Sequence, residues 1–585
     1  MWKLFSSMRK WIGNYLYFSK ATLCIRGLVL SHSFVNHVVI SVLITYLTVE
    51  IWKPSNDNYQ LAAVAINMLD GVSSIMVCVL AFISNRVGPF KVIASTNAAY
   101  ILGLVLLWSS FNYAGMKANA SDEVFYGAGL LLALGEAGRP AALGKFLDDQ
   151  YLSEADHKIK LPETKSIEEE DHISTRNEEQ EDHISTRKEE EDKQKRVEED
   201  KQKRGETRQT ALWSHPWFIG AAAPLALVNR SWKTQLLLSM IAVGVSYLLF
   251  WYGVFAYSRN IRNESNDPAV EDAPRDPGLC QAIKSLSPPE KTASLKFWLK
   301  PNSRKRYYKE MLVMCLAFIV YSLVEATGST FFFNQMSLLN YHIGNFKLPI
   351  IYFVILQSLS SSVISFLWRL LVPNPSKRAT LVRIGCGLVC SVLCMVAAWQ
   401  VEIRRKIKIN TEYIGKPKPD KISMSILWLI PQFSLLGFMR GLAADGLIEF
   451  FADRVDGNGK RKARYYGSYA SELVLGIGTL LTAVSILGFR RTWLVNDIYK
   501  NRLDKYYRGL VFIGVANLCY YFCVAVCFYT KEDNSQVICA ADGNQQSEMP
   551  GEDKKYYHHK VSSGGAETPD LEEMKSSFEC CSSFF

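Results

Sequence analysis

The sequence predicts an all-α membrane protein with 12 transmembrane helices in two six-helix bundles. Three observations lead to this prediction: apolar stretches of spanning length, a polar segment after the sixth of them, and basic residues in the loops. A helix of about 20 residues crosses a hydrocarbon core of about 30 Å. Lipid offers the backbone no hydrogen-bond partner, so spanning segments must be helical. Buried helices of a soluble protein would give apolar runs of only about 10–14 residues. The predicted spans are residues 31–51, 60–84, 92–110, 123–143, 211–229, 233–256, 309–333, 347–371, 380–401, 423–448, 466–488 and 509–530.

Residues 1–30 form the predicted cytoplasmic N-terminal segment. It carries five basic residues and no acidic residue, and basic segments remain on the cytoplasmic side of a membrane. With 12 spans the C-terminus is cytoplasmic as well. The basic loops at 373–379 and 452–465 agree with this orientation, whereas the basic loops at 402–421 and 489–508 would lie outside.

The first bundle combines transmembrane helices 1–4, residues 31–147, with helices 5–6, residues 211–256. A charged cytoplasmic insert at 148–210 separates them. Within it, residues 154–208 hold 19 acidic and 13 basic side chains, so we expect a disordered segment or a solvated helix. This block is also the candidate site for a protein partner.

The fifth span, residues 211–229, barely reaches spanning length. Pro216 lies near its start and Pro224 in its middle. Because proline removes a backbone donor, we expect this span to be kinked or partly interfacial.

The second bundle occupies residues 308–530. A cytoplasmic linker at 257–307, rich in proline, asparagine and charge, joins it to the first bundle. The tail at 531–585 is polar and is predicted to be disordered and cytoplasmic.

The chain has a net charge of +10 at pH 7. Since residues 154–208 are acidic overall, the positive charge belongs to the membrane-embedded body and its short loops. A basic balance at a membrane indicates anionic lipid head groups as partners. No basic-aromatic patch indicates nucleic acid.

The 13 cysteines do not predict a disulfide framework. Two trios have a spacing of four, which puts each trio on one helix face, where cysteine packs as a small apolar residue. No histidine or carboxylate accompanies them, so we predict no metal site and no cofactor. The trios are Cys386, Cys390 and Cys394, and Cys519, Cys523 and Cys527.

Polar and ionisable residues inside spans are the candidates for function, because burying them is costly unless they pair or line a cavity. For each, the alternative is a structural pair or a residue at the end of a span. Glu136 and Arg139 have the spacing of a local ion pair. Glu325 and Glu449 lack a basic residue one turn away. The substrate-binding or proton-coupling candidates are His32, Asn36, Asn67, Asp70, Arg139, Glu325, Gln335, Arg440, Asp445 and Glu449.

The chain carries no enzyme motif: it lacks a phosphate-cradling Gly-Lys-Ser/Thr loop, a His-Glu-x-x-His pair and a nucleophile elbow. It also lacks a repeated filter-like segment of the kind that channels use. A catalytic role is therefore not predicted.

Ordered motifs across both halves resemble the plant nitrate/peptide transporter family, the plant branch of the proton-dependent oligopeptide transporters. The match covers residues 28–150 and 211–530. It implies the major facilitator fold, coupling to a proton gradient, and substrates such as nitrate, short peptides or larger organic anions. The motifs include Leu-Ile-Thr-Tyr-Leu-Thr at 43–48, Asn67-Met-Leu-Asp-Gly71, Thr330-Phe-Phe-Phe-Asn-Gln335, Glu402-Ile-Arg-Arg405, Trp428-Leu-Ile-Pro-Gln-Phe433 and Gly446-Leu-Ile-Glu-Phe-Phe451.

The sequence departs from the family where charge matters most. The family's first helix carries Glu-x-x-Glu-Arg or Glu-x-x-Glu-Lys, and the corresponding positions here are Val29, His32 and Ser33. The family's span-four lysine aligns with Pro140, next to Arg139. A usual aspartate of span ten is replaced by Arg440, and the span-seven histidine of nitrate-selective members by Glu325.

These departures change the expected coupling. Without the span-one cation, the site loses a charge-assisted contact to a peptide carboxylate. Any proton coupling must use other groups, and we hypothesise that His32 titrates near physiological pH with Asp70, Glu325 or Glu449 as partners.

The predicted function is secondary transport of a small anionic solute, with coupling to protons as a hypothesis. Arg139 and Arg440 are the predicted cations of an anion site, and Glu449 is assigned to a substrate amine or to gating. Two alternatives remain: an uncoupled uniporter or exchanger, and a non-transporting sensor or scaffold that binds a partner through 154–208. The predicted location is the plasma membrane or the vacuolar membrane.

Overall fold

A computed structural model of the chain describes most of the predicted membrane body. The insert at 154–208 and the end of the tail lie outside the described residues. The described residues are 20–46, 58–112, 118–151, 213, 215–227, 230–257, 301–340, 342–343, 346–349, 351–372, 376–412, 422–453, 460–490, 492–494 and 501–548.

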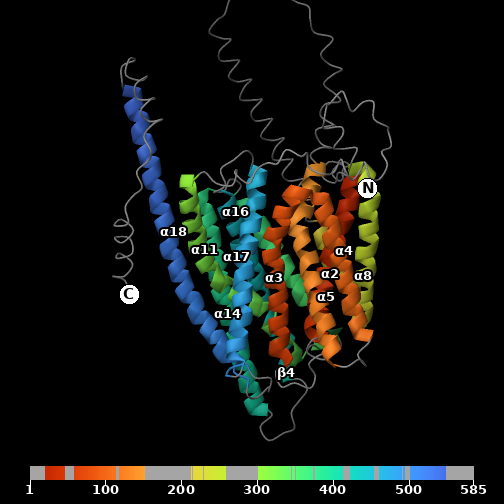
Figure 1. Ribbon diagram of the computed structural model, residues 1–585. Coiled ribbons are helices and arrows are strands. Elements are labelled where there is room, and N and C mark those ends of the chain that lie inside the picture. Colours follow the sequence, from red (N-terminus) through yellow and green to blue (C-terminus); the bar gives the residue numbers. More distant parts are fainter. Residues whose placement is uncertain are drawn as a thin grey trace, which may run out of the picture.

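The N-terminal half forms one group of helices, on the right of Figure 1. The first helix begins inside the predicted N-terminal segment, and its residues Ile25 and Leu28 are fully buried, so the first span starts before residue 31. The elements are α2 (Lys20–Tyr46), α3 (Asn58–Val87), α4 (Pro89–Asn112), α5 (Ala118–Gly138), the π-helix η2 (Arg139–Leu143), a helix over 144–151, a helix over 215–222, the 3-10 helix η3 (Ala223–Leu227) and α8 (Trp232–Tyr252).

The fifth predicted span changes geometry where the sequence places a proline. Its α-helix over 215–222 passes into η3, which contains Pro224. The missing N–H of proline interrupts the α-helical hydrogen-bond ladder, as expected for a kinked span.

The C-terminal half forms a second group, on the left of Figure 1. The last helix continues to Glu548, into the segment predicted to be a disordered tail. The elements are α11 (Pro301–Gly328), α12 (Phe331–Leu338), α13 (Ile351–Leu371), α14 (Lys377–Glu412), the 3-10 helix η6 (Ile426–Leu429), α15 (Ile430–Met439), the π-helix η7 (Arg440–Ala444), α16 (Asp445–Ala452), α17 (Lys460–Phe489) and α18 (Leu503–Glu548).

Four very short strands accompany the helices in the described part of the chain and were not predicted. β1 (Leu339–Asn340) pairs in parallel with β4 (Ile422–Ser425), and β2 (His342–Ile343) pairs antiparallel with β3 (Phe346–Lys347). The tenth predicted span therefore begins as a strand. We call the end of the molecule at which β4 lies the β4 end, and the opposite one the α16 end (Figure 1).

Helix occupies each of the 12 predicted ranges in the described part of the chain. Nine of the described helices are long and apolar enough to cross a membrane by themselves. Large apolar side chains such as Leu248 and Phe366 are exposed on the outer faces of their helices, where lipid replaces a protein partner. The all-α membrane fold is therefore confirmed.

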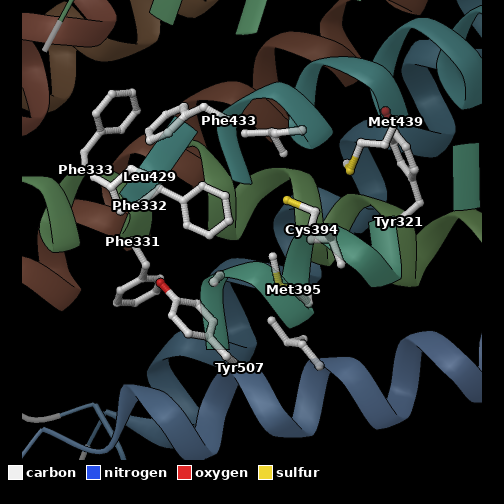
Figure 2. Close-up of a cluster of buried hydrophobic side chains, with 14 of the residues drawn as sticks. Tyr321, Phe331, Phe332, Phe333, Cys394, Met395, Leu429, Phe433, Met439 and Tyr507 are labelled. Atoms are coloured by element: carbon white, nitrogen blue, oxygen red, sulfur yellow. The ribbon is translucent and has the colours of Figure 1, made fainter. Parts of the chain in front are cut away.

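Aromatic side chains form the core of the C-terminal group (Figure 2). The ring of Phe433 on α15 lies 5.6 Å from the rings of Phe332 and Phe333 and 5.1 Å from that of Phe353. All four side chains are buried. These contacts hold α12, α13 and α15 together.

We expect Phe433→Leu to lower the free energy of unfolding by about 1–3 kcal/mol, because it removes three aromatic contacts and leaves unfilled volume. Thermal unfolding of the purified protein in detergent measures the change. Phe366→Leu, at an exposed position, is the control and should unfold like the unmodified protein. Equal losses in the two variants would contradict the assigned packing.

Candidate functional site

The predicted local ion pair of the fourth span is formed. Arg139 donates from Nη2 to Oε1 of Glu136 at 2.6 Å, and its guanidinium lies 4.6 Å from the ring centre of Trp217. Arg139 is the first residue of η2 and Pro140 the second. A π-helical turn in a spanning helix often marks a functional position.

His32 lies inside the N-terminal group. Its Nε2 is 2.8 Å from Oδ1 of Asn97, and its ring stacks on Tyr100 with centroids 4.9 Å apart. Nδ1 has no hydrogen-bond partner among the described residues. Glu136 and Arg139 lie within electrostatic range of the ring, so His32 borders the ion pair of the fourth span.

His37, one helical turn beyond Ser33, was not among the predicted candidates. Its Nδ1 is 2.7 Å from the carbonyl oxygen of Ser33 and therefore carries the proton. Its Nε2 is 3.1 Å from Oγ of Ser358 on α13 and accepts that hydrogen bond. His37 thus connects the two groups of helices in the half of α2 toward the β4 end.

Three other candidates of the N-terminal group take different positions. Asn36 is half-buried. Asn67 is fully buried, and neither polar atom of its side-chain amide has a hydrogen-bond partner among the described residues. Asp70 is exposed, although Glu136 and Arg440 lie within electrostatic range of its carboxylate. Its exposed surface therefore faces the space between the two groups.

The C-terminal group presents a matching arginine. Nε of Arg440 lies 3.5 Å from Oε1 of Glu325 on α11, and 60% of the Arg440 side chain is exposed. Asp70 on α3 and Glu472 on α17 lie within electrostatic range of its guanidinium. Solvent therefore reaches Arg440 between the two groups rather than at an outer face.

The two arginines occupy corresponding places in the two groups. Arg139 opens the π-helix η2 in the fourth predicted span, and Arg440 opens the π-helix η7 in the tenth, which is the fourth span of the second group. Each arginine has one carboxylate partner within its own group. Neither π-helix could be predicted from sequence, because local spacing does not distinguish it from an α-helical turn.

Glu472 completes this region and was missed by the sequence analysis. Ser74 on α3 donates a hydrogen bond to its carboxylate, and Arg139, Arg440 and Glu325 lie within electrostatic range. The signal was present, since Glu472 is an acid inside the eleventh predicted span. We name the following set the central charged site: Asp70, Glu136, Arg139, Glu325, Arg440 and Glu472.

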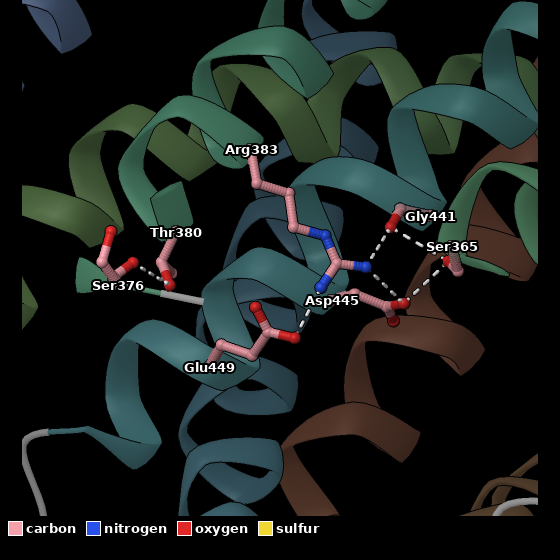
Figure 3. A network of polar contacts seen from close by, with 7 residues as sticks. All are labelled: Ser365, Ser376, Thr380, Arg383, Gly441, Asp445 and Glu449. Carbon is pink, nitrogen blue, oxygen red and sulfur yellow. Dashed lines mark hydrogen bonds and ion pairs between the residues drawn. The ribbon is translucent and has the colours of Figure 1, made fainter. Parts of the chain in front are cut away.

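Asp445 and Glu449 belong to a second cluster, toward the α16 end (Figure 3). Arg383 on α14 donates to Oε1 of Glu449 at 2.6 Å and to Oδ2 of Asp445 at 3.0 Å. Ser365 donates to the same Asp445 oxygen at 2.8 Å. Glu449 lacks a basic neighbour on its own helix, as the sequence indicated, but its partner comes from another helix.

Gln335 belongs to a third, fully buried cluster. It donates to Oε2 of Glu402 at 3.2 Å and accepts from Gln432 at 3.2 Å. Arg405 donates from Nε to the same Glu402 oxygen at 2.8 Å and from Nη2 to the other oxygen. The structure therefore places Gln335 apart from the central charged site.

The described cysteines form no disulfide with one another. Of the first trio, Cys394 is buried and Cys386 exposed, whereas all three of the second trio are exposed, so the trios do not pack uniformly. Among the described residues no group of three or more histidine, cysteine, aspartate or glutamate side chains has the arrangement of a metal site.

Comparison with known proteins agrees with the motifs. The POT family model PTR2 matches residues 283–461. The Arabidopsis thaliana protein NRT1/PTR FAMILY 5.10 is 25% identical over 564 residues, covering 86% of this chain and 92% of its own length. The Arabidopsis protein NRT1/PTR FAMILY 8.5 is 31% identical over 223 residues, which are 36% of either chain.

Solved structures show the same fold at lower identity. The POT family transporter PepTSo aligns with a TM-score of 0.55 at 13% identity, covering 89% of this chain and 99% of its own. An auto-inhibited POT family peptide transporter aligns with a TM-score of 0.53 at 14% identity, covering 88% and 96%. The predicted resemblance and the major facilitator fold are thus confirmed: the chain is a multi-pass membrane protein with the fold of the solved POT family transporters, and its sequence is similar to those of the Arabidopsis NRT1/PTR proteins.

Proposed function

We propose that the chain moves a small anionic solute through the central charged site together with protons. The observation that carries this proposal is the placement of one arginine from each group of helices at the first residue of a π-helical turn, with solvent reaching Arg440. Guanidinium groups bind carboxylate and similar oxyanions through paired N–H donors. An anion between Arg139 and Arg440 would contact both groups of helices at once.

The charge balance of the site supports proton coupling. Its four carboxylates outnumber its two arginines, so a solute anion would enter a region that already has excess negative charge. Burying a further like charge is unfavourable unless a carboxylate becomes protonated. Uptake of each anion should therefore require protons. Asp70 and Glu325 were predicted as partners of His32, and in this proposal the carboxylates carry the protons while His32 borders them.

The relatives support a panel of solutes rather than one compound. Solved POT family structures hold sulfate, alafosfalin and 5-aminolevulinic acid. For this chain the panel should contain nitrate, di- and tripeptides, and organic acids, because each presents an oxyanion that an arginine can bind.

Solute-evoked currents and labelled uptake in oocytes, at mildly acidic and mildly basic pH, test the proposal. We expect uptake that grows at acidic pH and falls with an uncoupler, accompanied by inward current where the solute enters with more protons than it carries negative charges. Arg440→Gln should lower uptake at subsaturating solute by at least about tenfold, since a charge-assisted hydrogen bond contributes about 1.5–3 kcal/mol. The control is Arg404→Gln, because Arg404 lies on the outer surface, 4.0 Å from the ring centre of Trp428.

Two outcomes would contradict parts of the proposal. Uptake that is equal at both pH values and insensitive to the uncoupler would indicate a uniporter or exchanger. Uptake of no solute in the panel would favour the sensor or scaffold alternative, which then requires a partner that binds the 154–208 block.

A further inference from the structure

Helices α3 and α17 contact each other along most of their length and join the two groups of helices (Figure 1). A Cβ added at Gly71 would lie 2.7 Å from the side chain of Leu480, and one at Gly476 would lie 2.9 Å from Cβ of Ser74 and 3.0 Å from the carbonyl oxygen of Gly71. The two backbones therefore touch. Small residues permit such close approach of spanning helices.

The α3 face of this contact carries small and polar residues at helical spacing. Gly71, Ser74 and Cys78 point at α17, and Sγ of Cys78 donates to the carbonyl oxygen of Tyr469 at 3.2 Å. Glu472 lies three residues beyond Tyr469, so an ionisable carboxylate sits inside a contact made of close-packed helices. A charge there is costly unless it is compensated.

The charged and polar groups that face Glu472 come from four other elements. Arg139 on η2 belongs to the N-terminal group, whereas Arg440 on η7 and Glu325 on α11 belong to the C-terminal group; Ser74 and Cys78 lie on α3. Glu472, which belongs to the C-terminal group, thus attracts Arg139 of the N-terminal group as well as Arg440 of its own. When Glu472 is ionised, its attraction to Arg139 and its hydrogen bond from Ser74 draw the two groups together across the α3–α17 contact.

Helix α17 also makes the neighbouring contacts between the two groups, closer to the α16 end. The hydroxyl of Tyr469 donates to the carbonyl oxygen of Ala141 at 3.0 Å, and the hydroxyl of Tyr465 donates to the carboxylate of Asp148. All of these contacts join the first third of α17 to the N-terminal group. Movement of α17 away from α3 would break them together.

We propose that Glu472 is a proton-controlled latch between the two groups of helices: ionised, it holds them closed at the α16 end, and protonated, it releases them. This role rests on the proposed transport function and assigns one step of it to a residue. Protonation removes the attraction to both arginines while leaving Ser74 a weaker, neutral partner.

A distance measurement tests the latch without any solute. Spin labels on an unnatural amino acid at Tyr252 and Leu371, which are 79% and 75% exposed at the α16 ends of α8 and α13, report the separation of the two groups. The full-length protein is measured in lipid nanodiscs at mildly acidic and mildly basic pH by pulsed electron resonance. We expect longer distances at acidic pH.

Glu472→Gln preserves the size of the side chain and cannot ionise, so it should show the longer distances at both pH values. Glu472→Asp is the conservative control and should restore the pH response. Three results would overturn the proposal. Glu472→Gln could keep the full pH response of the unmodified protein, or the response could be lost only in Glu325→Gln. The third is that the unmodified protein shows no response at all.

The latch and the transport proposal fail in different ways. If the distances change with pH in the unmodified protein but not in Glu472→Gln, and no solute is taken up, only the transport proposal is contradicted. Proton-dependent uptake, together with distances that do not change when Glu472 is replaced, would contradict the latch alone.

Discussion

Replacing Arg405 by methionine should lower the free energy of unfolding by about 3–5 kcal/mol, because Glu402 is left as an unpaired buried charge. Both side chains are almost completely buried, and both carboxylate oxygens of Glu402 accept from Arg405. Gln335 donates to Glu402 and cannot neutralise it. Thermal unfolding of the purified protein, followed by size-exclusion chromatography, measures the loss.

A double variant separates charge from packing. Arg405→Met combined with Glu402→Met removes both charges, and such replacements in a buried pair recover most of the stability. Lys408→Met provides a matched control, because Lys408 and Glu412 form a partly exposed pair at 3.6 Å that contributes about 1 kcal/mol or less. If Arg405→Met alone were as stable as the double variant, the claim that Arg405 compensates the buried charge of Glu402 would be wrong.

The membrane fold could be predicted because its main constraint is local. A spanning helix must satisfy its own backbone, so apolar stretches such as residues 60–84 and 466–488 predict α3 and α17 almost to their ends. The pair Glu136–Arg139 could be predicted for the same reason, since three residues of helix bring the two side chains together.

Contacts between helices could not be predicted in this way. Glu449 has no basic neighbour on its own helix, and only the packing of α14 against α16 brings Arg383 to within 2.6 Å of it. The same holds for Glu325 and Arg440. Glu472 differs from these, because an acid inside a span is itself a signal, although only the tertiary structure shows that it faces an arginine of each group.

Residues that are close in sequence also separate into different clusters of the C-terminal group. Arg440, Asp445 and Glu449 lie within ten residues of helix. The structure divides them, because Arg440 begins the π-helix η7 whereas Asp445 begins α16, and the two side chains reach different partners. Asp445 and Glu449 bind Arg383, while Arg440 faces the central charged site.

Replacing Glu325 by glutamine should abolish proton-driven accumulation of solute while exchange of solute across the membrane persists. In the unmodified protein, ionised Glu325 engages Arg440 at 3.5 Å and competes with a solute anion for it. Protonation removes this competitor, so solute binding should weaken as the pH rises. Glutamine leaves Arg440 available at every pH, and binding should lose this dependence.

Proteoliposomes measure both activities with a solute that gives currents in oocytes. A pH gradient drives accumulation, and preloaded unlabelled solute drives exchange. Glu412→Gln is the control, because Glu412 lies at the β4 end of α14 and pairs with Lys408. Accumulation that survives in Glu325→Gln would contradict its role. The carboxylate that competes with the solute anion for Arg440 would then be Asp70, which belongs to the other group of helices. Proton binding would in that case remove an attraction between the two groups, rather than one between two residues of the same group.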